Sequence, residues 1–264
     1  MVVRALITGA GRAIGAATAT ELAARGHDVV ATARDASLLE DLPVAQILAL
    51  DVSDPDSIHE ALAAAGDLDA VVNNAGVNAA GPLEGYPLDL LRQVFEINAF
   101  GPLQVIQPLL ERWRARGSGV IVNVSSVQGR VATPLEGAYS ASKFALEALS
   151  ETLHYELGHF GIRVVIIEPG YVAPGMKRSQ SHAGPEVYEE LAAQWSGVDV
   201  TLSGPAGRPG PQTVARAIAD ALEDPATPLR VPVGDDARLV LSTRAGLDDT
   251  NFEVTMRGVL GLSW

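Results

Sequence analysis

The sequence predicts an α/β fold, a doubly wound, seven-stranded parallel sheet with helices on both faces. Two observations support this fold class. Seven short runs rich in β-branched residues alternate with longer segments of helical periodicity, the pattern of a parallel sheet with crossover helices. Several runs, such as VVRALIT, GVIVNVS and IRVVIIE, are almost continuously apolar, as strands buried on both faces require.

Each element has a local signal. The strands are expected where apolar runs lie between turn residues, at 2–8, 28–33, 44–50, 70–73, 120–125, 163–168 and 229–233. The intervening helices are expected at 13–24, 55–65, 88–115, 137–157 and 212–222. Asp54 before Pro55 marks a helix start, because the aspartate oxygen caps free amides and proline needs no amide partner there. Pro102 and Pro108 are expected to kink the third helix.

The alternation stops between Tyr171 and Pro211, where the sequence becomes rich in glycine and proline and carries one short helical patch at 186–195. An insertion of this length is more often a lid or binding loop than a plain connection. We therefore expect a substrate lid at about 173–210 within one domain spanning 1–264, with a mobile surface loop as the alternative. The tail at 235–264 is expected to pack on the body or on a second subunit.

The composition excludes several classes of function. With 19 basic and 32 acidic residues, the net charge of −13 argues against nucleic acid or an anionic membrane surface as the main partner. The absence of cysteine excludes disulfides, thiolate catalysis and cysteine-ligated zinc. The five histidines show no HExxH pattern, so no metal site is expected. Since the sequence shows neither a membrane span nor a signal peptide, we expect a cytoplasmic protein.

A glycine-rich turn, Thr8-Gly9-Ala10-Gly11-Arg12-Ala13-Ile14-Gly15, joins the first strand to the first helix. Glycines let the backbone turn tightly and approach a pyrophosphate, which then lies at the helix N-terminus. Gly15 allows close packing of helix on strand. At this place in an alternating chain the turn predicts dinucleotide binding, with a plain structural turn as the alternative. The residues expected to bind are Gly9, Gly11, Arg12, Ala13, Ile14 and Gly15.

The end of the second strand favours NADP(H) over NAD(H). An NAD site would place an acidic residue here, roughly 20 residues after the glycines, to bind the ribose hydroxyls. This chain has Arg34 at the strand end, and Arg12 projects toward the same space. Two guanidinium groups can clamp a 2′-phosphate, although for either arginine alone a solvated surface residue is the favoured interpretation. Asp35 has two possible roles. It either caps the next helix, or contacts the ribose and so weakens the preference for NADP(H).

Tyr139 and Lys143 form the most informative pair. The chain has five tyrosines and two lysines, so this spacing is not expected by chance. Four residues apart on a helix, the two side chains share one face and are expected to be partly buried. There the ammonium would favour the phenolate and lower the tyrosine pKa from about 10, which suits a general acid/base. The alternative is a lysine that extends past a core tyrosine.

Together these motifs resemble those of the short-chain dehydrogenase/reductase family. The resemblance rests on Tyr139-x3-Lys143, Ser126 thirteen residues earlier in VNVSS, the TGAGRAIG turn and Asn73-Asn74-Ala75-Gly76. It covers residues 2–172 and, more loosely, 212–233, and is nearest to the steroid and retinoid dehydrogenases. It implies a Rossmann fold in which Tyr139 exchanges a proton with the substrate oxygen, Lys143 holds the nicotinamide ribose and Ser126 orients the substrate oxygen.

The same resemblance assigns further positions. Asn98 matches the asparagine that holds a water in the proton relay, and Ser126 is preferred to its neighbour Ser125 on the family spacing. The other implied cofactor contacts are Asp51, Val52, Asn74, Ala75, Gly76, Pro169, Gly170 and Val172. Two residues depart from the family pattern. Ala13 replaces a glycine, which is tolerable if the backbone is helical, and Pro174 replaces a threonine that would contact the carboxamide.

The expected function is therefore NADP(H)-dependent interconversion of a ketone or aldehyde and an alcohol. A hydrophobic small-molecule substrate is expected, because the insertion offers an apolar wall of Tyr171, Met176, Tyr188, Leu191 and Trp195, unless these residues simply anchor the lid. The alternatives are a non-catalytic cofactor sensor or scaffold, and an epimerase or dehydratase, which the chain length disfavours. The resemblance also implies a homodimer or homotetramer formed through helices 88–115 and 137–157.

Overall fold

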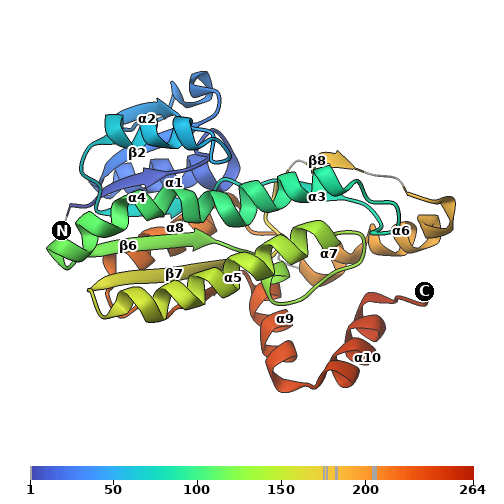
Figure 1. Cartoon of the computed structure of the whole chain (residues 1–264). Coiled ribbons are helices and arrows are strands. Elements are labelled where there is room, and N and C mark those ends of the chain that lie inside the picture. The colour runs from blue at the N-terminus through green and yellow to red at the C-terminus, as the bar shows by residue number, and fades with distance from the viewer. Residues whose placement is uncertain (1, 175, 177, 182–183, 204–206) are drawn as a thin grey trace.

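The computed structural model describes residues 2–174, 176, 178–181, 184–203 and 207–264. Its centre is a seven-stranded sheet in which every neighbouring pair is parallel, in the order β3-β2-β1-β4-β6-β7-β9 (Figure 1). The strands are β1 (Arg4–Ile7), β2 (Asp28–Ala33), β3 (Gln46–Ala49), β4 (Ala70–Asn73), β6 (Gly119–Val124), β7 (Ile162–Pro169) and β9 (Arg230–Val233). The predicted fold class is confirmed.

The central strands are apolar on both faces because each face is covered by helices. Successive side chains of a strand point to opposite sides of the sheet. Thus Ile7 belongs to one hydrophobic core and its neighbour Leu6 to the other, and Val72 and Val71 divide in the same way. All four of these side chains are fully buried. The continuous apolar runs of the sequence are explained by these two cores.

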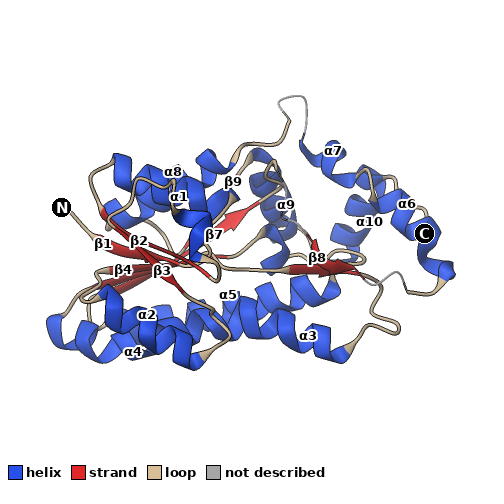
Figure 2. Ribbon diagram, turned by 90° about the horizontal axis from the view of Figure 1, so that it is seen from above, coloured by secondary structure: helices blue, strands red, loops and turns tan. Residues whose placement is uncertain are grey.

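Helices cover both faces of the sheet (Figure 2). One face carries α1 (Ala13–Ala24) and α8 (Pro211–Glu223); the other carries α2 (Pro55–Ala65), α4 (Gly101–Arg116) and α5 (Gly137–Gly158). The start of α2 is capped as expected, because Asp54 Oδ1 accepts hydrogen bonds from the amides of Asp56 at 3.0 Å and Ser57 at 3.4 Å.

The predicted long helix at 88–115 is interrupted. It divides into α3 (Leu88–Phe95), a π-helical turn η2 (Glu96–Phe100) and α4. The interruption lies just before Pro102, which has no N–H to offer the carbonyl of Asn98. The expected distortion at Pro102 is therefore present, whereas α4 continues through Pro108.

Several elements were not predicted. A small parallel sheet pairs β5 (Asn78–Ala80) with β8 (Arg178–Ser181), and short 3-10 turns form η1 (Ala36–Leu39) and η3 (Val127–Gly129). The helical patch of the insertion is confirmed as η4 (Glu186–Tyr188) and α6 (Glu189–Trp195), followed by α7 (Val198–Ser203). The tail forms α9 (Asp235–Gly246) and α10 (Asp249–Leu260), which project from the sheet toward the insertion (Figures 1 and 2). Among the described residues, no helix is both long and apolar enough to cross a membrane.

Candidate active site

One large cavity, about 940 Å³, lies at the carboxyl-terminal ends of the parallel strands. Its wall is formed by residues that follow β1, β2, β3, β4, β6 and β7, together with α5 and the C-terminal half of the chain. The order of the strands reverses between β1 and β4, and ligands of such sheets bind beside this point. Every site residue predicted from the sequence lines the cavity except Gly15 and Asn98.

The glycine turn is fixed by its contact with the segment after β4. Gly9 has a φ of +67°, and a Cβ atom there would lie 2.8 Å from Ala75 Cα. A Cβ atom on Gly15 would lie 2.3 Å from the Gly9 oxygen. Asn74 Nδ2 donates to the carbonyls of Thr8 and Gly9, both at 3.0 Å. A side chain at Gly9 or Gly15 would displace the backbone, so Gly15 shapes the turn from behind the cavity wall.

The backbone at Ala13 is not helical, contrary to the expectation that made an alanine tolerable there. Its φ is +46°, which lies in the left-handed region. In this region the alanine Cβ crowds the neighbouring carbonyl, at a cost of roughly 1–2 kcal/mol. The departure from the family glycine at this position therefore strains the turn that begins α1.

Replacing Ala13 with glycine is expected to stabilise the protein. Glycine relieves the backbone strain at residue 13, but it also gives the unfolded chain more conformational entropy. The free energy gained from the first effect should exceed the free energy lost to the second by about 0.5–1 kcal/mol, which corresponds to a rise in Tm of about 1–4 °C. Thermal denaturation measures this change. Ala17→Gly, in the regular part of α1, is the control and should lower Tm. Equal destabilisation by both substitutions would contradict the assignment of strain to Ala13.

Two arginines line the cavity in the segments that follow β1 and β2. Arg12 and Arg34 are exposed and line the cavity, and neither forms an ion pair or a side-chain hydrogen bond with the residues that the structure describes. Asp35 Oδ1 accepts from the amide and hydroxyl of Ser37, at 3.1 and 2.7 Å, and these bonds lower the Asp35 pKa. Asp35 thus caps η1, one of its two predicted roles.

Tyr139, Lys143 and Ser126 meet on the wall of the same cavity. Tyr139 is 7% exposed and Lys143 is 3% exposed. Lys143 Nζ lies 5.8 Å from the centroid of the Tyr139 ring and donates to the carbonyl of Val124 at 2.8 Å. The Ser126 hydroxyl is hydrogen-bonded to Tyr139, while Ser125 Oγ is buried without a hydrogen-bond partner among the described residues. Of the two adjacent serines, Ser126 is the one that contacts the tyrosine.

The predicted lowering of the Tyr139 pKa is wrong for this arrangement. Burial raises the pKa of Tyr139 well above its usual value, the hydrogen bond from Ser126 opposes that rise, and the Glu136 carboxylate adds to it. Burial likewise lowers the pKa of Lys143 to about 8, against the attraction of Glu147. Desolvation is the largest influence on both pKa values. Tyr139 is therefore a neutral phenol at neutral pH.

Asn98 lies in η2, behind the cavity wall. It is fully buried, its Oδ1 accepts from the amide of Val77 at 2.9 Å, and its Nδ2 donates to the Val77 carbonyl at 2.9 Å. Nδ2 also donates to Ser142 Oγ at 3.0 Å. The side chain thus ties the segment after β4 to α5, the helix of Tyr139 and Lys143.

Behind Ser125 lies a buried charge cluster that the sequence reasoning missed. Glu168 is the penultimate residue of β7 and is 1% exposed. Burial, followed by repulsion from Glu147, raises its pKa to about 7. Arg230 Nε donates to Glu147 at 3.0 Å, and its Nη2 donates to Glu151 at 2.6 Å. Glu168 stands 4.0 Å from Arg230. A glutamate at the end of the apolar run IRVVIIE was the available signal.

Glu168→Gln is expected to raise the free energy of unfolding at pH 8 and to change this free energy little at pH 5. Since the folded pKa of about 7 exceeds the usual 4.5, the folded state holds this proton more tightly, and stability is lost as pH rises through that window. The gain at pH 8 should be about 1–2 kcal/mol after discounting for solvent screening. Urea unfolding at both pH values measures it, with Glu151→Gln as the ion-pair control. An effect independent of pH would contradict this account.

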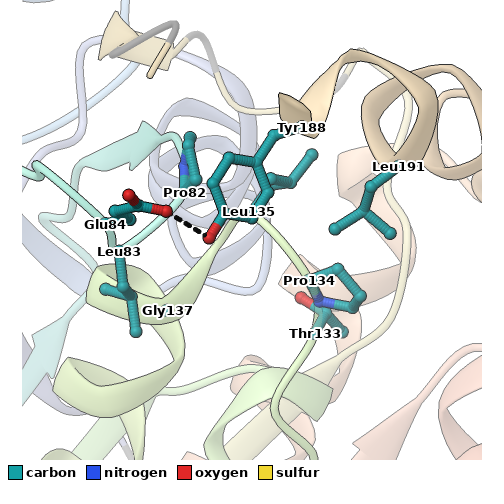
Figure 3. A pocket seen from close by; sticks show the side chains of 9 residues that line it. All are labelled: Pro82, Leu83, Glu84, Thr133, Pro134, Leu135, Gly137, Tyr188 and Leu191. Atoms are coloured by element: carbon teal, nitrogen blue, oxygen red, sulfur yellow. Dashed lines mark hydrogen bonds between the residues drawn. The ribbon is translucent and has the colours of Figure 1, made fainter. Parts of the chain in front are cut away.

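The insertion and the C-terminal helices complete the cavity. Of the predicted apolar wall, Tyr171, Met176 and Trp195 line the large cavity. Tyr188 and Leu191 instead line a separate cavity of about 280 Å³, where the Tyr188 hydroxyl donates to Glu84 at 2.9 Å (Figure 3). These two residues anchor the insertion to the body, which was the alternative reading of the wall.

Comparison with known proteins identifies the family. The sequence pattern of the family described as short chain dehydrogenase matches residues 3–184. The chain belongs to this family. A short-chain dehydrogenase from Streptomyces avermitilis has a similar structure, with a TM-score of 0.80 and 36% identity over 98% of this chain and 99% of that one.

Other members of the short-chain dehydrogenase family differ in cofactor. A short chain dehydrogenase from Burkholderia cenocepacia in complex with NADP has a TM-score of 0.76 and 26% identity over 98% of this chain and 97% of its own. A 3-oxoacyl-[acyl-carrier protein] reductase with bound NAD from Brucella melitensis has a TM-score of 0.70 and 30% identity over 83% of each chain. Human retinol dehydrogenase 8 is 32% identical over 85% of this chain and 79% of its own length. An oxidoreductase that uses a nicotinamide cofactor is thereby indicated.

Proposed function

We propose that this short-chain dehydrogenase is an NADP(H)-dependent oxidoreductase that interconverts a ketone or aldehyde and an alcohol on a hydrophobic substrate. The observation that carries the proposal is the buried Tyr139, hydrogen-bonded to Ser126 and one helical turn from the buried Lys143, on the wall of the cavity that also contains the glycine turn. A proton donor and a cofactor cradle facing one cavity are the parts that carbonyl reduction needs.

The residues present fit a dinucleotide. Gly9 brings the backbone of the turn into contact with Ala75, and Arg12 and Arg34 supply positive charge at the cavity in a chain of net charge −13. A Cβ atom on Gly76 would lie 3.9 Å from Lys143 Nζ, so a ligand passing Gly76 lies within reach of this cation. The remaining predicted contacts, Asp51, Val52, Pro169, Gly170 and Val172, line the same cavity.

Each polar residue has a distinct part in the proposed reaction. A bound nicotinamide supplies or accepts the hydride. Tyr139 donates its proton to the substrate oxygen, and Ser126 donates a hydrogen bond that orients this oxygen. Lys143 is proposed to hold the ribose hydroxyls. The Asn98 side chain is bonded to Val77 and Ser142 and fixes the strand end beside Lys143, so the proposed relay water would be held by the main-chain carbonyl of Asn98. Because burial raises the pKa of Tyr139, its hydroxyl holds the proton that reduction of a carbonyl would consume.

Preference for NADP(H) is part of the proposal. Arg12 and Arg34 lie at the cavity with no partner among the described residues. Asp35 also lines the cavity, but its Oδ1 is engaged by Ser37. A 2′-phosphate would be held by charge-assisted hydrogen bonds from the two guanidinium groups. The NADP bound by the Burkholderia relative supports this preference, whereas the Brucella relative binds NAD.

The test is consumption of NADPH, and of NADH in parallel, with a panel of ketones and aldehydes of increasing apolar size. We expect kcat/KM with NADPH to exceed kcat/KM with NADH by at least about tenfold, which is the contribution of one charge-assisted hydrogen bond. If NADPH binds but no carbonyl is reduced, the non-catalytic sensor or scaffold becomes the better description.

A further inference from the structure

The far end of the large cavity is built by apolar side chains from the C-terminal half of the chain. Trp195 of α6, Leu202 of α7 and Val240 of α9 line it, as do Met256 and Leu260 of α10. All five follow residue 184, outside the region that the family pattern matches. The cavity thus joins the cofactor cradle to an apolar end that belongs to another part of the chain.

Helix α10 presents an apolar stripe to this cavity. Met256 and Leu260 are four residues apart, so they share one face of the helix, and both are half-buried. Val254 and Val259, which do not line the cavity, are 66% and 52% exposed. No residue of α10 is fully buried. The stripe is therefore only partly covered by protein, although it faces the cavity, and an apolar ligand would cover the rest.

The segment after α10 is fastened to the insertion by one side chain, Gln194. Its Oε1 accepts from the amides of Ser263 and Trp264, at 3.0 and 3.3 Å, and its Nε2 donates to Ser263 Oγ at 3.0 Å. The Trp264 ring lies against Tyr188, with centroids 6.1 Å apart. Tyr188 in turn donates to Glu84 of the body (Figure 3). A continuous chain of contacts therefore holds α10 in place beside the cavity.

We propose that α10, positioned by Gln194, is the far wall of the substrate site, and that the substrate carries an apolar chain or ring system reaching from Tyr139 to Met256 and Leu260. This inference rests on the proposed function and specifies its substrate class. Burial of each additional methylene against this wall should strengthen binding. Methionine suits such a wall, because its flexible side chain adapts to ligands of different shape.

The experiment compares hexanal, octanal, decanal and dodecanal as substrates in the presence of NADPH. For the unaltered protein, kcat/KM should rise by about 10- to 100-fold from hexanal to dodecanal. This is below the more than about 10³-fold expected from full burial of the added methylenes, because the wall would cover the chain only in part. In Met256→Ser and Leu260→Ser this ratio should collapse toward one, and in Gln194→Ala it should fall by about three- to tenfold. Val259→Ser, on an exposed face of the same helix, is the matched control and should keep the full ratio. Thermal denaturation and NADPH affinity confirm that each variant is folded.

A second measurement separates this inference from the proposed function. Calorimetry follows the binding of hexanol and decanol to the NADP-loaded protein, which requires no turnover. If decanol binds more tightly than hexanol and this difference is lost in Leu260→Ser, the inference is supported even if no aldehyde is reduced. Failure to reduce any aldehyde would then overturn the proposed function alone. Reduction of the aldehydes without any dependence on length, or an equal loss in Val259→Ser and Leu260→Ser, would overturn the inference alone.

Discussion

Replacing Tyr139 with phenylalanine is expected to lower kcat for carbonyl reduction by about 10²–10⁴-fold, the usual contribution of a positioned proton donor. The substitution removes the hydroxyl and keeps the ring that fills the buried space beside Lys143. The glycine turn and the two arginines remain unchanged, so the affinity for NADPH should stay within about twofold. A loss in kcat without a loss in cofactor binding is the signature of a group that acts on the reacting atoms.

Steady-state reduction of the best aldehyde or ketone measures the rate, and fluorescence titration measures NADPH binding. Tyr155→Phe is the matched control, because Tyr155 lies on the same helix and is 74% exposed. This control should retain full activity. If Tyr139→Phe also retains it, the proton comes from another group and the proposed role of Tyr139 is wrong.

Removing the two guanidinium groups at the adenosine end is expected to abolish the preference for NADPH. Each of Arg12→Ala and Arg34→Ala should raise the KM for NADPH by about tenfold, and the double variant by about 100-fold, because each arginine loses one charge-assisted contact. The KM for NADH, which lacks the 2′-phosphate, should change little. The ratio of kcat/KM for NADPH to that for NADH should therefore fall by about tenfold in each single variant and by about 100-fold in the double variant.

The ratio is best measured at two salt concentrations, since the contribution of exposed charges weakens as ionic strength rises. Arg112→Ala is the control: Arg112 is exposed on α4 and pairs with Asp67, away from the cavity wall. It should leave the ratio unchanged. Equal use of NADH and NADPH by the unaltered protein would contradict the predicted role of Arg12 and Arg34.

Much of the fold could be predicted because its signals are local. The strands at 28–33 and 70–73 and the helices at 13–24 and 55–65 coincide with the predicted ranges to the residue. In each, a turn or capping residue marks the boundary, as Asp54 does for α2. The meeting of the glycine turn, Ser126 and Tyr139 at one cavity also follows from sequence, since parallel strands bring the segments that follow them to one edge.

What the sequence could not predict depends on contacts between distant segments. The pKa of Tyr139 is set by burial, which no spacing reveals, and the left-handed backbone of Ala13 follows from packing around the turn. The pairing of β5 with β8 and the place of Met256 and Leu260 at the cavity have no motif. The single domain with its lid, the homodimer or homotetramer and the cytoplasmic location stay predictions.

The central claim is that this cavity transfers a hydride to a carbonyl carbon while Tyr139 protonates the oxygen. The most direct test uses NADPH carrying deuterium at the transferable position and follows the product by mass spectrometry. The account predicts an alcohol with one deuterium on the former carbonyl carbon, formed by the unaltered protein and Tyr155→Phe and at least about 100-fold more slowly by Tyr139→Phe. A protein that binds NADPH and yields no deuterated alcohol from any aldehyde or ketone would contradict it.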